Sequence, residues 1–209
     1  DLLNLERPLS LWAIQRLSRL QPGRKVPGAT TEVVKLGLTS LRLYRPAEPS
    51  GAGLLWLHGG GLVLGSPAMD DEFCGRLAAT HGITVASLDY RLAPKFPFPA
   101  ALDDSHAGWS WLREAGASGV DPGRLAVGGR SAGGGLAACL AQRLHDEAEP
   151  VRAQWLFCPM LDDRTTLKQD HEGRGEFVWA PGSNRLAWTS YLGHALGRQA
   201  RQSRRARWP

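Results

Sequence analysis

The 209-residue sequence has few cysteines and no long apolar segment. Its three cysteines, Cys74, Cys139 and Cys158, each lie within an apolar pattern. So few, without dense spacing, argue against a disulfide framework, and none has a Cys or His partner at metal-site spacing. We expect all three to be buried and unreactive in a reducing, cytoplasmic compartment, and we expect no metal. No run reaches about 18 apolar residues, so we expect no membrane span.

Acidic residues are fewer than basic ones, but the excess of positive charge is confined to one segment. The formal net charge is +5, and residues 197–209 contain five arginines and no acid. The rest of the chain is formally neutral, so the folded domain has no basic excess for nucleic-acid binding. Salt-sensitive nucleic-acid binding by this tail is a distant alternative. The tail has almost no apolar residues, and we predict that it is disordered.

The remaining sequence has the composition of one globular domain, with 43% hydrophobic and 22% charged residues. It begins with Asp1 rather than Met, which indicates a processed chain or a fragment. A helix is predicted over 9–20, because apolar residues recur every third position at Leu11, Ile14, Leu17 and Leu20. Residues 31–45 alternate and are rich in β-branched side chains, which predicts one or two strands.

An alternation of strands and helices follows. Strands are predicted at 53–57, 83–88, 125–128 and 151–157. Helices are predicted near 69–80, 100–115, 132–147 and 184–192. This order predicts an α/β fold whose mostly parallel sheet is covered by helices on both faces.

A G-x-S-x-G pentapeptide, residues 129–133, lies between a predicted strand and a predicted helix. A sharp strand-to-helix turn strains the backbone of its central residue and needs small neighbours, which Gly129 and Gly133 supply. The turn would lift Ser131 to the carboxyl edge of the sheet, where ligands of open α/β sheets bind. The following helix would direct its positive end toward developing negative charge. Ser131 is therefore the candidate nucleophile.

A second glycine-rich segment, His58-Gly59-Gly60-Gly61, follows the strand at 53–57. Glycines leave backbone N–H groups free of side chains, as an oxyanion hole requires. The loop would donate through Gly59 and Gly60, and the residue after the nucleophile, Ala132, would be the other donor. A phosphate-cradling loop is the alternative, but no Lys-Ser/Thr follows and no G-x-G-x-x-G is present.

With both motifs in view, the chain resembles the hormone-sensitive-lipase-type esterases, the HGGG branch of the α/β-hydrolases. Residues 89–94 (DYRLAP), 96–100 (FPFPA) and 131–134 (SAGG) agree with that family, and the resemblance extends to about Gly193. It implies hydrolysis of small apolar esters without a cofactor, and an N-terminal helical cap over the site. Arg130 stands where the family often has an acidic residue. Because this position takes no part in the reaction, we expect the difference to have little consequence.

The resemblance also implies a catalytic acid and then a histidine after the serine, in Asp-Pro-Leu-Arg-Asp-like and His-Gly-Phe-like segments. Neither segment occurs here. His58, His81, His106 and His145 are each placed unfavourably, whereas His171 and His194 could reach the site. Asp162 and Asp163 resemble a structural turn, Asp103 and Asp104 a pair on a helix face, and Asp121 a turn residue. A chain cut short by a shifted reading frame is the simplest account, and it would leave an exposed strand edge.

We therefore expect an incomplete α/β-hydrolase domain over 1–196, with a cap region at 1–30, followed by the basic tail at 197–209. The expected function is carboxylic ester hydrolysis by Ser131, with Gly59, Gly60 and Ala132 holding the oxyanion and with little activity in this chain alone. A non-catalytic small-molecule binder and an amidase or formamidase are the alternatives. Oligomeric state does not follow from the sequence.

Overall fold

The computed structural model describes residues 8–19, 23–114, 119–149, 151–168 and 179–194. Six strands form one sheet in the order β1-β2-β4-β3-β5-β6. The strands are β1 (Ala29–Leu36), β2 (Thr39–Pro46), β3 (Gly53–Leu57), β4 (Thr84–Leu88), β5 (Leu125–Arg130) and β6 (Ala153–Phe157). The last four are mutually parallel, whereas β1 and β2 form an antiparallel hairpin beside β4. The α/β fold with a mostly parallel sheet is confirmed.

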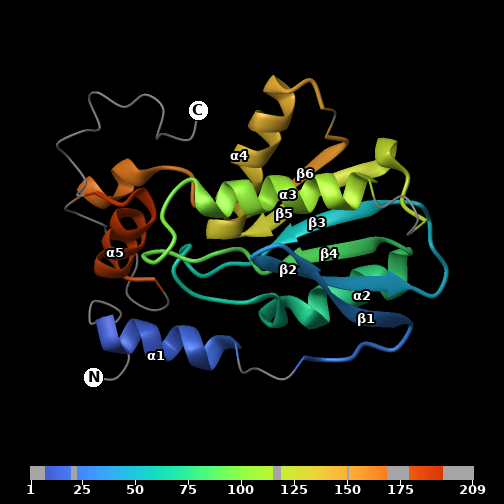
Figure 1. The fold of residues 1–209 in the computed structure, drawn as a ribbon, viewed down its shortest axis with the longest axis horizontal. Coiled ribbons are helices and arrows are strands. Elements are labelled where there is room, and N and C mark those ends of the chain that lie inside the picture. The colour runs from blue at the N-terminus through green and yellow to red at the C-terminus, as the bar shows by residue number, and fades with distance from the viewer. Residues whose placement is uncertain (1–7, 20–22, 115–118, 150, 169–178, 195–209) are drawn as a thin grey trace.

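Five α-helices connect or flank these strands within the described residues: α1 (Pro8–Arg19), α2 (Asp71–His81), α3 (Ala100–Glu114), α4 (Ala132–Asp146) and α5 (Pro181–Leu192). Helices α3 and α4 lie on one face of the sheet and α2 on the other. Helices α1 and α5 lie beyond the end toward which β3 and β4 point (Figure 1). The predicted tail at 197–209 lies outside the described residues.

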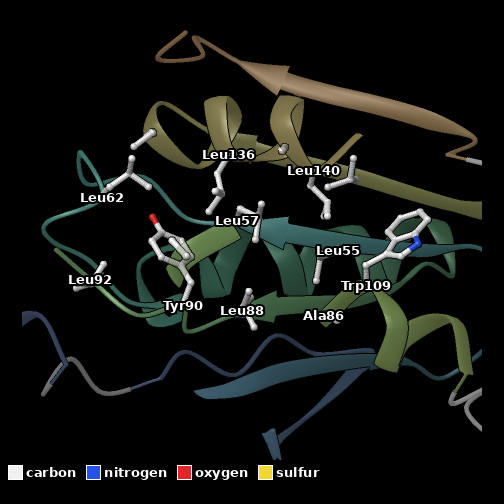
Figure 2. Packing of buried hydrophobic residues seen from close by; sticks show 14 of the residues in the cluster. Leu55, Leu57, Leu62, Ala86, Leu88, Tyr90, Leu92, Trp109, Leu136 and Leu140 are labelled. Carbon is white, nitrogen blue, oxygen red and sulfur yellow. The ribbon is translucent and has the colours of Figure 1, made fainter. Parts of the chain in front are cut away.

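Side chains of the central strands point alternately to the two faces of the sheet, so each face has its own part of the core. Leu55 and Leu57 of β3 face α3 and α4, and Figure 2 shows Leu136 and Leu140 of α4 directed toward them. Trp56, between them in sequence, faces α2 instead and packs with Phe73. All five β3 residues are buried. A continuous apolar run is what a strand covered on both faces requires, which is why β3 was predictable.

One expectation about packing is wrong. Leu11 of α1 is buried, but Leu17 is 64% exposed, so the three-residue spacing overstated the apolar face of this helix. Strand β6 is the sheet edge and its side chains are mostly exposed, including Trp155 at 44% and Phe157 at 57%. The sheet is therefore covered on both faces in its centre but not at β6.

The three cysteines are all free thiols with different environments. Cys74 and Cys139 are buried, as expected, but Cys158 is exposed because it follows the edge strand β6. Burial raises the pKa of the Cys139 thiol to about 12. The described residues hold no cluster of three potential metal ligands, and no described helix has the length and apolar character needed to span a bilayer.

Candidate active site

Ser131 occupies a sharp corner between β5 and α4. Strand β5 ends at Arg130 and helix α4 begins at Ala132, so Ser131 alone makes the turn. Its backbone angles are φ 54° and ψ −118°, in the left-handed half of the map, where a residue with a Cβ is strained. The Ser131 N–H donates to the Phe157 carbonyl at 2.9 Å, and the Ser131 carbonyl accepts from Met160 N at 2.9 Å. The end of β6 thus fixes the corner on both sides.

The glycine-rich loop lies against this corner. Strands β3 and β5 are adjacent and in register, with Leu57 opposite Gly129, so the two motifs leave the sheet side by side. A Cβ placed on Gly59 would lie 3.6 Å from the Ser131 Cβ. A Cβ on Gly133 would overlap the carbonyl oxygen of Leu57, so only glycine permits helix α4 to approach β3 this closely. The structure brings together the two segments that the sequence singled out.

The residues predicted to hold the oxyanion, Gly59, Gly60 and Ala132, belong to the glycine-rich loop and to the start of α4. Within the described residues, no loop or turn hydrogen bond is donated by Gly59, Gly60 or Ala132. Ala132 is the first residue of α4, and the first N–H groups of a helix have no intrahelical acceptor. Gly60 has φ 120°, which glycine adopts without strain. The positive end of the 15-residue helix α4 adds to the attraction for negative charge at this point.

Tyr90 contacts His58, the first residue of the glycine-rich loop. Its hydroxyl donates to the His58 carbonyl at 2.8 Å, and its ring stacks on the His58 imidazole with centroids 4.2 Å apart. Both residues are fully buried. Burial raises the pKa of the Tyr90 phenol well above its usual value, so it stays a hydrogen-bond donor. The His58 Nδ1 lies 2.7 Å from the Gly59 carbonyl oxygen, so this side chain shapes the loop.

Arg130, the second residue of the pentapeptide, forms an ion pair with a buried carboxylate. Its Nη2 lies 2.9 Å from Asp70 Oδ1, and Asp70 is only 3% exposed. The other Asp70 oxygen accepts from Trp56 Nε1 at 2.9 Å. Burial raises the pKa of Asp70, while the Trp56 hydrogen bond and the Arg130 charge lower it again. Arg130 was expected to have little consequence, yet it links the corner at Ser131 to the chain after the glycine-rich loop.

Helices α1 and α5 contact the loops at this edge. The Gln15 side chain on α1 donates to the carbonyls of Val63 and Ala93 at 2.7 and 3.1 Å. From α5, the Tyr191 carbonyl accepts from Phe98 N at 2.6 Å. A Cβ on Gly61 would meet Ala187 of α5 at 3.2 Å. The two helices therefore flank the glycine-rich loop on the carboxyl side of the sheet.

Three of the remaining histidines, His81, His106 and His145, lie on helices α2, α3 and α4. His81 ends α2 at the amino edge of the sheet, and His106 Nε2 lies 2.7 Å from Glu147 Oε2. His145 is near the far end of α4. His194 follows α5, and His171 lies outside the described residues.

The acidic residues considered from the sequence have structural partners. Asp162 caps a 3-10 helix through Arg164 N and also binds the Arg164 guanidinium, which supports the predicted turn. Asp121 accepts from Gly123 N at 2.8 Å, as a turn residue does. Asp103 and Asp104 pair with arginines from other elements, Asp103 with Arg143 and Asp104 with Arg91.

Comparison with known proteins identifies the family of this fold and site. Residues 54–206 match a family model described as the alpha/beta hydrolase fold. An ethyl acetate hydrolase of Pseudomonas putida is 46% identical over 129 residues, covering 58% of this chain and 41% of the relative. A carboxylic ester hydrolase, LipN, of Mycobacterium tuberculosis is 40% identical over 161 residues, covering 71% of this chain and 43% of the relative.

Solved structures give the same result. A bacterial heroin esterase aligns with a TM-score of 0.78 and 32% identity, over 92% of this chain and 63% of that structure. An esterase/lipase from an uncultured bacterium aligns with a TM-score of 0.75 and 29% identity, over 88% of this chain and 62% of that structure. The chain thus spans about two fifths of these curated relatives and less than two thirds of these structures.

Proposed function

This chain belongs to the hormone-sensitive-lipase-type branch of the α/β-hydrolase fold family, and from that premise we propose that it hydrolyses carboxylic esters with Ser131 as the nucleophile. The observation that supports the proposal is the strained corner at Ser131, with Gly59 of the neighbouring loop in contact distance of it. A hydroxyl beside free backbone donors and a helix N-terminus is suited to acyl transfer.

In the proposed reaction, Ser131 Oγ attacks the ester carbonyl carbon and its proton passes to a base. The carbonyl oxygen becomes an oxyanion and accepts hydrogen bonds from the N–H groups of Gly59, Gly60 and Ala132. When the intermediate collapses, the alcohol leaves with a proton and the acyl group stays on Ser131. Water then attacks the acyl group and releases the acid. The substrate is a small apolar ester, and no cofactor takes part.

The base is the unassigned element of this site. A serine hydroxyl is a weak nucleophile until a base takes its proton. Neither the acid segment nor the histidine segment that the family resemblance implies occurs in this sequence, so we propose that no working base is present and that this chain alone reacts slowly. Serine hydrolases without one triad member keep an acceleration of about 10³–10⁴ over water, from the oxyanion hole and binding.

The test is to treat the 209-residue protein with a fluorophosphonate probe and with p-nitrophenyl butyrate. We expect slow labelling of Ser131, found by peptide mass spectrometry, and weak turnover. Labelling should vanish in Ser131→Ala, and both labelling and turnover should persist in Ser110→Ala, which removes a hydroxyl from α3. Labelling that is unchanged in Ser131→Ala would refute Ser131 as the nucleophile. Rapid turnover would refute the proposed lack of a working base.

The same preparations separate the alternative functions. If p-nitrophenyl butyrate binds but neither turnover nor Ser131 labelling occurs over days, the chain is a non-catalytic binder. If the matching p-nitroanilide is cleaved faster than the ester, the chain is an amidase. The proposal requires that the ester be the better substrate.

A further inference from the structure

A cavity lies at the carboxyl edge of the sheet, two strands away from β5. It has a volume of about 450 Å³ and is walled by α1, by the turn between β1 and β2, and by the chain after β4. The latter two walls are joined where Asp89 N donates to the Ser40 carbonyl at 2.9 Å. Neither Ser131 nor any residue of the glycine-rich loop lines this cavity. Its volume is within the range of small-molecule sites.

The lining of this cavity is rich in positive charge. Each wall contributes at least one cation: Arg16 from α1, Lys35 from the hairpin, and Arg91 and Lys95 from the chain after β4. Arg91 is bound to Asp104, but within the described residues Arg16, Lys35 and Lys95 form no ion pair. Among the described lining residues, Asp89 is the one acid. Three unpaired cations against one acid leave a net attraction for an anion.

Two aromatic rings complete the lining. Arg16 lies over the Trp12 ring, 5.6 Å from its centroid, and Lys95 lies over the Phe96 ring at 5.0 Å. Trp12 is 59% exposed, so its ring is available to stack on a ligand. The cations are therefore placed next to apolar surface, which a bare inorganic anion does not use but an anion with an aromatic or alkyl body does.

We propose that this cavity binds a small organic anion, in which a carboxylate or phosphate group contacts Arg16, Lys35 and Lys95 and an apolar body packs on Trp12 and Phe96. The site is separate from Ser131, and the inference does not depend on the proposed esterase activity. A neutral molecule would leave the cations unused, and a cation would be repelled by them.

The test measures benzoate binding to the 209-residue protein by isothermal titration calorimetry, alongside acetate, benzyl alcohol and phenyl phosphate. Benzoate and phenyl phosphate should bind, and high salt should weaken both because it screens the cations. Acetate, which lacks the ring, and benzyl alcohol, which lacks the charge, should bind more weakly than benzoate. Equal binding of benzyl alcohol and benzoate would overturn the proposal.

Matched variants locate the binding. An exposed ion pair typically changes an affinity by about two- to fivefold, so Arg16→Gln with Lys35→Gln should raise the benzoate dissociation constant about tenfold. Lys25→Gln with Arg152→Gln removes the same charge from exposed positions outside the cavity and should change it less than about twofold. Ser131→Ala should leave it unchanged. Loss of binding in Ser131→Ala, or equal losses in the two double variants, would refute the site.

Discussion

The ion pair between Arg130 and Asp70 allows one prediction to be worked through. In Arg130→Gln, the Asp70 carboxylate keeps its Trp56 hydrogen bond but loses its countercharge while only 3% exposed. Unit charges about 4 Å apart attract by about 4 kcal/mol at an effective dielectric constant of 20. The Arg130 side chain is 40% exposed, so water screens part of this attraction. We expect the variant to lose about 2 kcal/mol of unfolding free energy at neutral pH.

The loss should depend on pH, because Asp70 can be protonated instead of paired. Burial already raises the pKa of Asp70, and removing Arg130 takes away a charge that lowers it. A carboxyl whose pKa is higher in the folded state binds protons more readily when folded. Its contribution is therefore favourable below the unfolded value of about 4 and is lost as pH rises through the folded value. The gap between wild type and Arg130→Gln should be small near pH 4 and larger at pH 7.

Urea unfolding followed by tryptophan fluorescence measures both effects. Asp70→Asn and the double variant complete a thermodynamic cycle, whose coupling energy we expect to be about 2 kcal/mol at pH 7. Arg76→Gln is the control, because Arg76 pairs with Glu72 on the surface of α2 and should cost less than about 0.5 kcal/mol. A coupling energy near zero, or a loss independent of pH, would refute the assignment of Arg130 to Asp70.

Three further changes test the packing around the site. Gly133→Ala should cost at least about 3 kcal/mol or prevent folding, because its Cβ overlaps a β3 carbonyl oxygen; unaltered urea stability would contradict this. Tyr90→Phe removes the hydrogen bond to the His58 carbonyl and should cost about 1 kcal/mol while slowing fluorophosphonate labelling; an unchanged labelling rate would mean that this bond does not position the loop. A maleimide should react quickly with Cys158 and slowly with the two buried cysteines, and three equally fast reactions on mass spectrometry would show that the buried environments are wrong.

The central elements were predictable because their sequence signals are local. Strand β3 was predicted with its observed bounds from one apolar run between glycine-rich segments, and the helix after Ser131 was predicted to within one residue. The corner at Ser131 was predictable for the same reason, since small residues flank it in the sequence. The geometry of the nucleophile and its loop thus followed from two short motifs, while their catalytic roles stay a proposal.

The features that escaped prediction depend on residues far apart in the chain. Asp70 and Arg130 are 60 residues apart, and no periodicity connects them. The charged cavity is formed by three separate segments, and the sequence of each segment alone predicts only an ordinary exposed surface. Cys158 was expected to be buried because its neighbours are apolar, but burial depends on what covers β6, and the sequence around it does not encode that.

The register between β3 and β5 sets the geometry around Ser131. Leu57 and Gly129 are opposite each other on adjacent strands, so main-chain hydrogen bonding alone sets the spacing between the two motifs to about one strand separation, roughly 4.8 Å. Side chains on the outer strands take no part in setting that spacing. Substitutions on the outer strands can therefore change what surrounds the serine and leave the distance between Ser131 and the glycine-rich loop the same.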